Sequence, residues 1–179
     1  MADCIIEVSD KLFATAESLS FKGTCEIDCI SQGATRYVFS EPLTYDVCVT
    51  NTGGALLVSG TVFGVAKTQC GRCLEDTEFE IEGEVEDYFL LPGADTEFTK
   101  EEEDEYEVLS EDKTIDLKSL LIAALSLEFP YVPLCSDDCK GLCPQCGANL
   151  NTEACLCDEN DDIDEMNPFA VLKNYKFSE

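Results

Sequence analysis

The sequence predicts an α+β fold: an antiparallel β-sheet, arranged as a meander or a partly open barrel, with one major helix and a cysteine-rich module. Apolar and polar residues alternate in several runs between residues 21 and 85, which is the period of half-buried strands. A leucine-rich segment at residues 116–129 has the spacing of an amphipathic helix. Six cysteines fall within residues 135–157, a turn-rich stretch too short for a hydrophobic core of its own.

The first forty residues predict short elements. Residues 4–8 are apolar and indicate a strand. Residues 9–19 carry four apolar side chains at helical spacing, which predicts a short amphipathic helix. From residue 21 to residue 29 the period changes to two, as in a half-buried strand, and residues 37–39 form a brief apolar continuation.

The central residues predict an antiparallel meander. Residues 43–49 alternate, Asn51-Thr-Gly-Gly54 offers a hairpin turn, and residues 55–66 return as a more buried run that leads to Cys70. Residues 79–85 then alternate with glutamates, which places five carboxylates on one face of a strand: Glu78, Glu80, Glu82, Glu84 and Glu86. A solvated face is the ordinary interpretation of these glutamates, and a docking stripe for a partner's lysines and arginines is the alternative.

The remaining residues predict one firm helix between acidic stretches. Residues 92–113 are acidic and predict a flexible linker or loop. Thr114 or Asp116 can cap the helix at residues 116–129, and Pro130 ends it. Residues 158–165 form a second acidic stretch, and Asn167 with Pro168 opens a short terminal helix. We therefore expect a sheet domain at residues 1–134, a metal-binding module at 135–157 and a linker with a short helix at 158–179.

Eight of the twelve cysteines have the spacing of metal ligands. In Cys143-Pro-Gln-Cys146-Gly and Cys70-Gly-Arg-Cys73 a gap of two residues lets both sulfurs converge on one ion. The preferred partition is two closed, structural four-thiolate zinc sites, which join Cys70, Cys73, Cys135 and Cys139 in one, and Cys143, Cys146, Cys155 and Cys157 in the other. The rival partition joins Cys70 and Cys73 with Cys143 and Cys146 in one site, as in a zinc ribbon.

Disulfides and an iron–sulfur cluster are the alternatives to zinc. The first eight residues carry no basic region followed by an apolar stretch, so we expect a cytoplasmic protein, in which cysteines at this spacing are more often metal ligands. The gaps between the six clustered cysteines differ from the repeated two-residue gap of ferredoxins. Cys4, Cys25, Cys29 and Cys48 lie in strand patterns, and we interpret them as small buried hydrophobic residues.

Charge and composition exclude several function classes. The chain has 38 acidic and 11 basic residues, a formal net charge of −27, so non-specific binding to nucleic acid is disfavoured and a basic partner protein is favoured. The absence of histidine excludes His-dependent triads and histidine-ligated catalytic zinc. The longest uncharged stretch, residues 51–66, is too short to span a bilayer. We therefore expect a protein that is not an enzyme.

Four stretches, in this order, resemble the bacterial and plastid YceD family, also known as domain of unknown function 177. They are Cys70-Gly-Arg-Cys73-Leu-Glu75, the leucine-rich helix with Pro130-Tyr-Val-Pro-Leu134, Cys139-Lys-Gly-Leu-Cys143-Pro-Gln-Cys146-Gly-Ala-Asn-Leu-Asn151, and Asn167-Pro-Phe-Ala-Val-Leu172. The resemblance covers roughly residues 43–176. It implies a role in 23S ribosomal RNA accumulation and large-subunit biogenesis, and family genes commonly neighbour that of a small basic ribosomal protein. In the family the position matching Cys135 can be another type of metal ligand, which favours the preferred partition.

Three functions follow from these observations. The first is a non-enzymatic, zinc-stabilised assembly factor that binds a basic ribosomal protein or a large-subunit precursor. The second is direct RNA binding through the zinc module, although Arg72 and Lys140 are the only basic residues near its paired cysteines. The third is a dithiol redox protein that uses Cys70 and Cys73, which would need a helix start to favour the thiolate.

Overall fold

The structure is a computed structural model in which residues 4–93 and 106–157 are described. The elements in chain order are β1 (Ile5–Glu7), the 3-10 helix η1 (Asp10–Phe13), β2 (Ser18–Cys25), β3 (Cys29–Gln32), β4 (Thr35–Phe39), β5 (Leu43–Asn51), β6 (Ala55–Gln69), β7 (Asp76–Leu90), β8 (Glu107–Val108), β9 (Thr114–Asp116) and α2 (Leu117–Glu128). The chain forms two compact units. The sheet unit comprises the residues up to Gly71 with Glu75–Cys135, and the cysteine-rich unit comprises Arg72–Leu74 with the residues from Ser136 onward.

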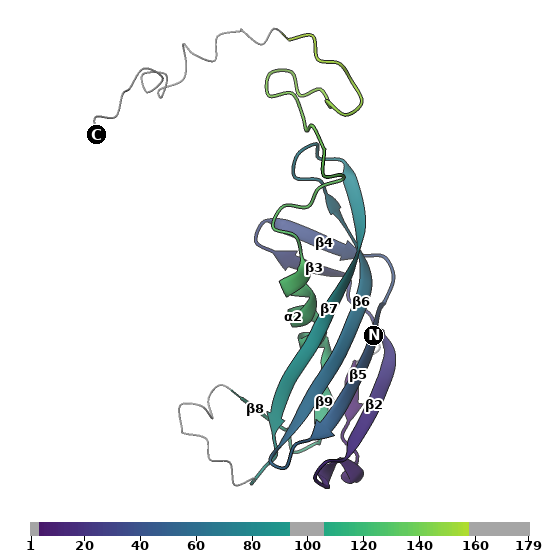
Figure 1. Ribbon diagram of the computed structural model, residues 1–179, viewed down its shortest axis with the longest axis vertical. Helices are drawn as coiled ribbons and strands as arrows, with labels where there is room; N and C mark the ends of the chain where they lie inside the picture. Colours follow the sequence, from purple (N-terminus) through teal and green to yellow (C-terminus); the bar gives the residue numbers. More distant parts are fainter. Residues whose placement is uncertain (1–3, 94–105, 158–179) are drawn as a thin grey trace, which may run out of the picture. The chain divides into compact units, whose positions relative to one another are not determined.

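The sheet unit contains a seven-stranded open sheet and a two-stranded one. In the large sheet β5 pairs with β2 and with β6. β6 also pairs with β7 and with β4, and β4 pairs with β3. All of these pairings are antiparallel. β8 adds a short parallel pairing to the end of β7. β1 pairs with β9 in the small sheet. This mostly antiparallel architecture, with one α-helix among the described residues, confirms the predicted fold class (Figure 1).

The hairpin of β6 and β7 is the longest element of the sheet. All fifteen residues of β7 pair with β6 in continuous register, from Asp76 opposite Gln69 to Leu90 opposite Ala55. Ile81 and Val85 are buried on the inner face, whereas the five alternating glutamates are exposed. The predicted alternation of this strand is therefore confirmed, because its period of two matches a sheet with one covered face.

Helix α2 covers the inner face of the sheet (Figure 1). The Asp116 carboxylate caps it by accepting a hydrogen bond from the Lys118 N–H at 2.9 Å. The buried face consists of Leu117, Leu120, Leu121, Ala124 and Leu125. Leu127, which the leucine spacing also allows on this face, is 84% exposed. At Gly83 of β7 the helix lies so close that a Cβ atom there would be 2.9 Å from the backbone of Ala124. This contact requires glycine at the crossing of helix and strand.

The end of α2 is held by aromatic packing. The Phe129 ring stacks on the Tyr37 ring of β4 with 3.8 Å between centroids. The Tyr37 hydroxyl donates a hydrogen bond to the Pro130 carbonyl at 3.0 Å. Burial raises the pKa of Tyr37, so the phenol keeps this donor proton throughout the neutral range. These contacts direct the chain from the helix toward Cys135.

The predicted amphipathic helix at residues 9–19 is wrong. The structure has the four-residue η1 in this range, and β2 begins at Ser18. Ala16 has a positive φ of 67°, which ends any helical continuation. Leu19, one of the four apolar residues at helical spacing, lies in β2 instead and pairs with Val49 of β5. A helix of this length has little stability of its own, and sheet pairing outweighs it.

The structure changes two further predictions, one for a strand near the N-terminus and one for the acidic segment. β2 runs from Ser18 to Cys25, and Cys29 already belongs to β3, so the predicted strand at residues 21–29 is divided. In the predicted loop at 92–113, residues 94–105 lie outside the described residues, but β8 and the buried Leu109 belong to the fold. The predicted linker at 158–165 and the terminal helix at 167–176 also lie outside the described residues.

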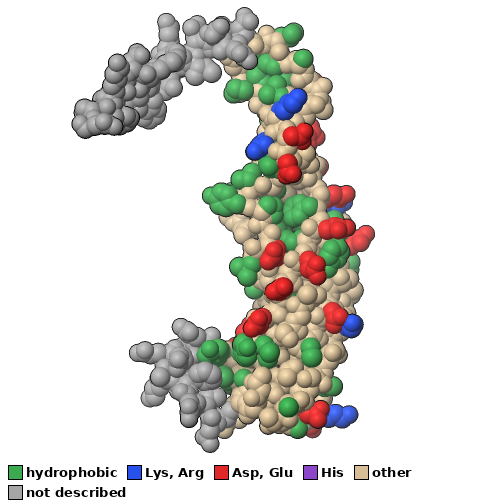
Figure 2. All heavy atoms as spheres, viewed as in Figure 1, with side chains coloured by type: hydrophobic (Ala, Val, Ile, Leu, Met, Phe, Trp, Pro, Cys, Tyr) green, Lys and Arg blue, Asp and Glu red, His purple; other side chains and the backbone are tan. Residues whose placement is uncertain are grey.

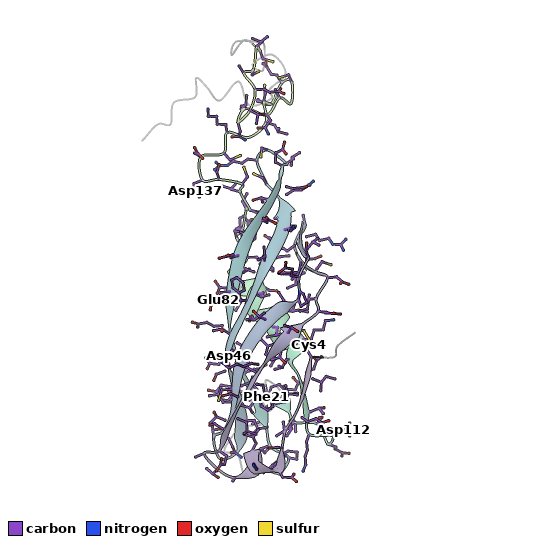
Figure 3. All side chains as sticks on the ribbon, turned by 90° about the vertical axis from the view of Figure 1, so that its right-hand side faces the viewer. Cys4, Phe21, Asp46, Glu82, Asp112 and Asp137 are labelled. Atoms are coloured by element: carbon purple, nitrogen blue, oxygen red, sulfur yellow. A yellow bond between two sulfur atoms is a disulfide. The ribbon has the colours of Figure 1, made fainter. Side chains whose placement is uncertain are left out.

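Cys4 and Cys25 form a disulfide, which corrects their interpretation as free buried residues. Both are buried, and they are 21 residues apart in sequence. Cys4 precedes β1 and Cys25 ends β2, so the bond connects the small sheet to the large one (Figure 3 labels Cys4). Cys29 and Cys48 are free and half-buried.

Candidate metal centres

The eight cysteines predicted as ligands form two groups of four in the structure. Within each group the sulfur atoms all lie within 4.8 Å of one another. The first cluster consists of Cys70, Cys73, Cys135 and Cys139, and the second cluster of Cys143, Cys146, Cys155 and Cys157. This grouping is the preferred partition. It differs from the ribbon, which would place Cys70 and Cys73 in one site with Cys143 and Cys146. Each cluster could hold one metal ion.

The turn between β6 and β7 positions two thiols of the first cluster. The Cys70 N–H donates to the Glu75 carbonyl at 2.8 Å and closes the turn, and Leu74 takes a positive φ of 61°. The Gly71 N–H donates to the Pro133 carbonyl at 2.8 Å, which fixes the chain just before Cys135. Cys70 and Cys73 are buried to 0% and 3% exposure. Buried thiolates need a compensating positive charge, which a metal ion supplies.

Asn151 organises the loop that carries Cys139. Its side-chain amide donates to the Cys139 sulfur at 3.4 Å, and its side-chain oxygen accepts from the Lys140 N–H at 2.8 Å. The same amide donates to the Asn149 side chain at 2.9 Å. Hydrogen bonds to a metal-bound sulfur orient the ligand and stabilise its charge. Sequence reasoning missed this role of Asn151, since spacing does not reveal which side chain points at a sulfur.

Arg72 forms hydrogen bonds with the backbone of its own unit. Its guanidinium donates to the Cys139 carbonyl at 3.0 Å and to the Asp137 carbonyl at 3.4 Å. The Arg72 carbonyl in turn accepts from the Leu142 N–H at 3.2 Å. Gly141 has a positive φ of 77°, and a Cβ atom there would be 3.1 Å from the Arg72 carbonyl oxygen. One of the two basic residues near the paired cysteines therefore has a structural role.

A compact turn positions the second cluster. The Gly147 N–H donates to the Cys143 carbonyl at 2.9 Å, and the Cys143 N–H donates to the Ala148 carbonyl at 2.8 Å. Gly147 adopts a positive φ of 75°, which glycine allows without strain. The Cys155 sulfur lies 3.2 Å from that of Cys143 and 3.5 Å from that of Cys146. These separations exceed the bond length of a disulfide, which is about 2.05 Å.

The thiols of the second cluster have unequal acidities. Hydrogen bonding from the Cys146 backbone, followed by the Cys155 side chain, lowers the pKa of Cys143 to about 6. The side chains of Cys155 and Cys146 raise the pKa of Cys157 to about 12. The Cys157 backbone lowers the pKa of Cys155, but the side chains of Cys143 and Cys146 raise it overall. One thiolate forms readily and opposes further ionisation beside it, so a bound cation would relieve the charge.

Comparisons with known proteins place this arrangement in a family. The model of the family described as "Large ribosomal RNA subunit accumulation protein YceD" matches residues 58–176, which include all eight clustered cysteines. The chain belongs to the YceD family. The resemblance drawn from the cysteine motifs is thereby confirmed. No solved structure matches the chain.

Relatives of this YceD chain occur in bacteria and plants. An uncharacterized protein of Mycobacterium tuberculosis is 37% identical over 128 residues, which cover 72% of this chain and 58% of the relative. One from Mycobacterium leprae is 35% identical over 63% of this chain and 51% of the relative. A maize protein named "Large ribosomal RNA subunit accumulation protein YCED homolog 1, chloroplastic" is 28% identical over 65% of this chain and 48% of the relative. This YceD chain thus spans only about half the length of these relatives.

Proposed function

We propose that this protein is a non-enzymatic zinc-binding factor in large ribosomal subunit biogenesis, which supports 23S ribosomal RNA accumulation by binding a basic ribosomal protein or an assembly intermediate. Membership of the YceD family carries the proposal, because the family and its plant members are named for large-subunit RNA accumulation. The four-sulfur donor sets of the two cysteine clusters support zinc as the metal, and the negative net charge supports a basic protein as the partner.

Zinc fits the donor set of both clusters. Four sulfurs without histidine or carboxylate ligands suit a soft or borderline cation, and zinc takes four thiolates in tetrahedral geometry. Four-thiolate sites have no open position for a substrate, so the ions would have a structural role. Cys70, Cys73, Cys135 and Cys139 would hold one ion, and Cys143, Cys146, Cys155 and Cys157 the other. The metal would stabilise turns that have few buried apolar side chains.

The charge of the surface supports a basic protein partner. Acidic side chains (red) greatly outnumber basic ones (blue) along the visible face of the protein in Figure 2. The formal charge of −27 would accelerate encounter with a basic protein and repel the phosphates of RNA. Direct RNA binding is further disfavoured because the Arg72 guanidinium is already engaged with backbone carbonyls. No described helix is long and apolar enough to span a membrane.

The redox alternative has weaker support. Cys70 and Cys73 lie in a turn between two strands and not at the start of a helix, where a helix dipole would favour the thiolate. Both thiols are also buried and grouped with two further sulfurs, as metal ligands would be. We therefore propose a structural role for the pair.

Affinity copurification tests the proposed function. The tagged chain, expressed at native level in its own cells, is captured at low and at high salt, with and without ribonuclease. We expect basic large-subunit proteins or precursor particles at low salt, retained after ribonuclease and reduced at high salt because the attraction is electrostatic. The absence of any large-subunit component would refute the proposal. Loss of capture after ribonuclease would instead indicate binding through RNA.

A further inference from the structure

β7 has an open edge along most of its length. One side of the strand pairs with β6 from Asp76 to Leu90. On the other side, only Phe89 and Leu90 pair, with the short β8. Among the strands in the described residues, none pairs with Asp76–Tyr88 on this side. Open edges of this length present backbone donors and acceptors to which another strand can add.

The register shows which backbone groups point toward the open edge. At one end of the hairpin the Leu91 N–H donates to Gly54, and at the other the Cys70 N–H donates to Glu75. Odd-numbered residues of β7 therefore bond to β6, and even-numbered residues point the other way. The Leu90 carbonyl, which accepts from the Leu109 N–H on the open side, agrees with this direction.

The even-numbered residues of the open edge include the five glutamates. The backbone groups of Glu78, Glu80, Glu82, Glu84 and Glu86 point to the open edge, and their side chains are exposed on the outer face. Glu82 projects away from the sheet in Figure 3. Lys67 of β6 forms an exposed ion pair with Glu78 at 3.1 Å. Opposite the other four glutamates, β6 presents Val65, Phe63, Thr61 and Ser59, which carry no charge.

The open backbone edge and the row of glutamates beside it together favour one kind of added strand. Side chains of a strand added at the edge would lie beside the glutamates, about 4.5–5.5 Å away between Cβ atoms. A second copy of β7 would place glutamate against glutamate, which is unfavourable. A strand with lysine or arginine at every second residue would place a cation beside each carboxylate. The spacing of charges along β7 therefore matches an extended basic segment.

We propose that the open edge of β7, from Glu78 to Glu86, binds an extended segment of a basic partner protein as an added antiparallel or parallel strand, with lysine or arginine at alternate positions. The inference rests on the proposed function, since it names the surface that recognises the basic ribosomal partner. Backbone hydrogen bonds would supply binding that does not depend on sequence, and the alternation of charge would supply selectivity.

A set of synthetic peptides tests the mode of binding. The probe is a fluorescent nine-residue peptide that alternates threonine and lysine. The controls are a peptide of the same composition with its lysines consecutive, and an alternating peptide that is N-methylated at every residue whose N–H would face β7. We expect the alternating peptide to bind about tenfold more tightly than the block peptide, with N-methylation removing the advantage. Equal binding of all three would overturn strand addition and leave only general charge attraction.

Hydrogen exchange locates the binding site. In the complex with the alternating peptide, the amides of Glu80, Glu82 and Glu84 are expected to exchange more slowly, because each would gain a hydrogen-bond acceptor. The amides of Ile81 and Gly83 already face β6 and are expected to change little. Protection confined to other strands, or protection equal at odd and even positions, would overturn the proposal.

Charge variants separate the contribution of the β7 edge to peptide binding from the contribution of the protein's overall charge. The edge variant carries Glu80→Gln, Glu82→Gln and Glu84→Gln. The control variant carries Glu17→Gln, Glu26→Gln and Glu41→Gln at exposed positions outside β7, and changes the net charge equally. We expect the edge variant to lose about tenfold in affinity for the alternating peptide, and the control variant to lose much less.

Copurification with the same variants separates the two proposals. If wild type and both variants capture large-subunit proteins equally, the assignment to the β7 edge is wrong while the proposed function stands. If wild type captures none, the proposed function itself fails. Loss of capture in the edge variant alone, together with retention in the control variant, is the result expected of strand addition.

Discussion

Replacing Cys70 with serine is expected to lower the zinc content of the purified chain from about two ions to about one. Cys70 lies in the first cluster with Cys73, Cys135 and Cys139, and a serine hydroxyl is a poor ligand for zinc. Structural zinc sites bind with apparent free energies on the order of 10–16 kcal/mol, and a site with three thiolates loses a large share of that. Metal analysis by plasma mass spectrometry, together with thermal unfolding, measures the effect.

Matched variants make this result decisive. Cys143→Ser is expected to remove the other ion, because Cys143 belongs to the second cluster. Cys48→Ser, at a free and half-buried cysteine outside both clusters, is expected to keep both ions. A chain that carries both Cys70→Ser and Cys143→Ser is expected to hold no zinc, because the two residues belong to different clusters. Retention of one ion in this double variant would place both residues in one site and support the ribbon. A wild-type chain that stays folded and metal-free after mild chelation would contradict structural zinc altogether.

Replacing Cys4 and Cys25 together with alanine is expected to destabilise the sheet unit by about 3 kcal/mol. The two residues are 21 apart, and closing a loop of this length restricts the unfolded chain by about that free energy. The expected fall in melting temperature is roughly 6–12 °C, measured by calorimetry on metal-loaded protein. Alanine keeps both buried positions apolar, so no buried hydroxyl contributes to the change.

A second double variant controls for the loss of sulfur atoms. Cys29 and Cys48 are free and half-buried, and their replacement with alanine is expected to change the melting temperature much less. Equal melting temperatures for the wild type and the Cys4→Ala, Cys25→Ala variant would show that the bond contributes nothing to stability. An equal fall in both double variants would assign the effect to side-chain packing instead.

The parts of the fold that depend on local pattern were predictable from the sequence. The alternation of β5, β6 and β7 identified these strands, and the turn at Asn51–Gly54 identified their first hairpin. The leucine spacing, with Thr114 or Asp116 as cap and Pro130 as stop, identified α2, and the structure selects Asp116 as the cap. In each case the pattern extends over enough residues for burial of one face to decide the conformation. The predicted helix at residues 9–19 failed because its pattern was short and Leu19 gains more from pairing with Val49.

The spacing of cysteines determined which thiols are candidate ligands, and left two partitions open. Only the tertiary structure groups Cys143 with Cys155 and Cys70 with Cys135, because it decides which turns meet. The disulfide between Cys4 and Cys25 was hidden for the same reason: an apolar strand pattern explains a buried cysteine equally well whether or not another sulfur lies beside it. The open edge of β7 is likewise a property of the sheet, since strand order is set by long-range pairing that no local period records.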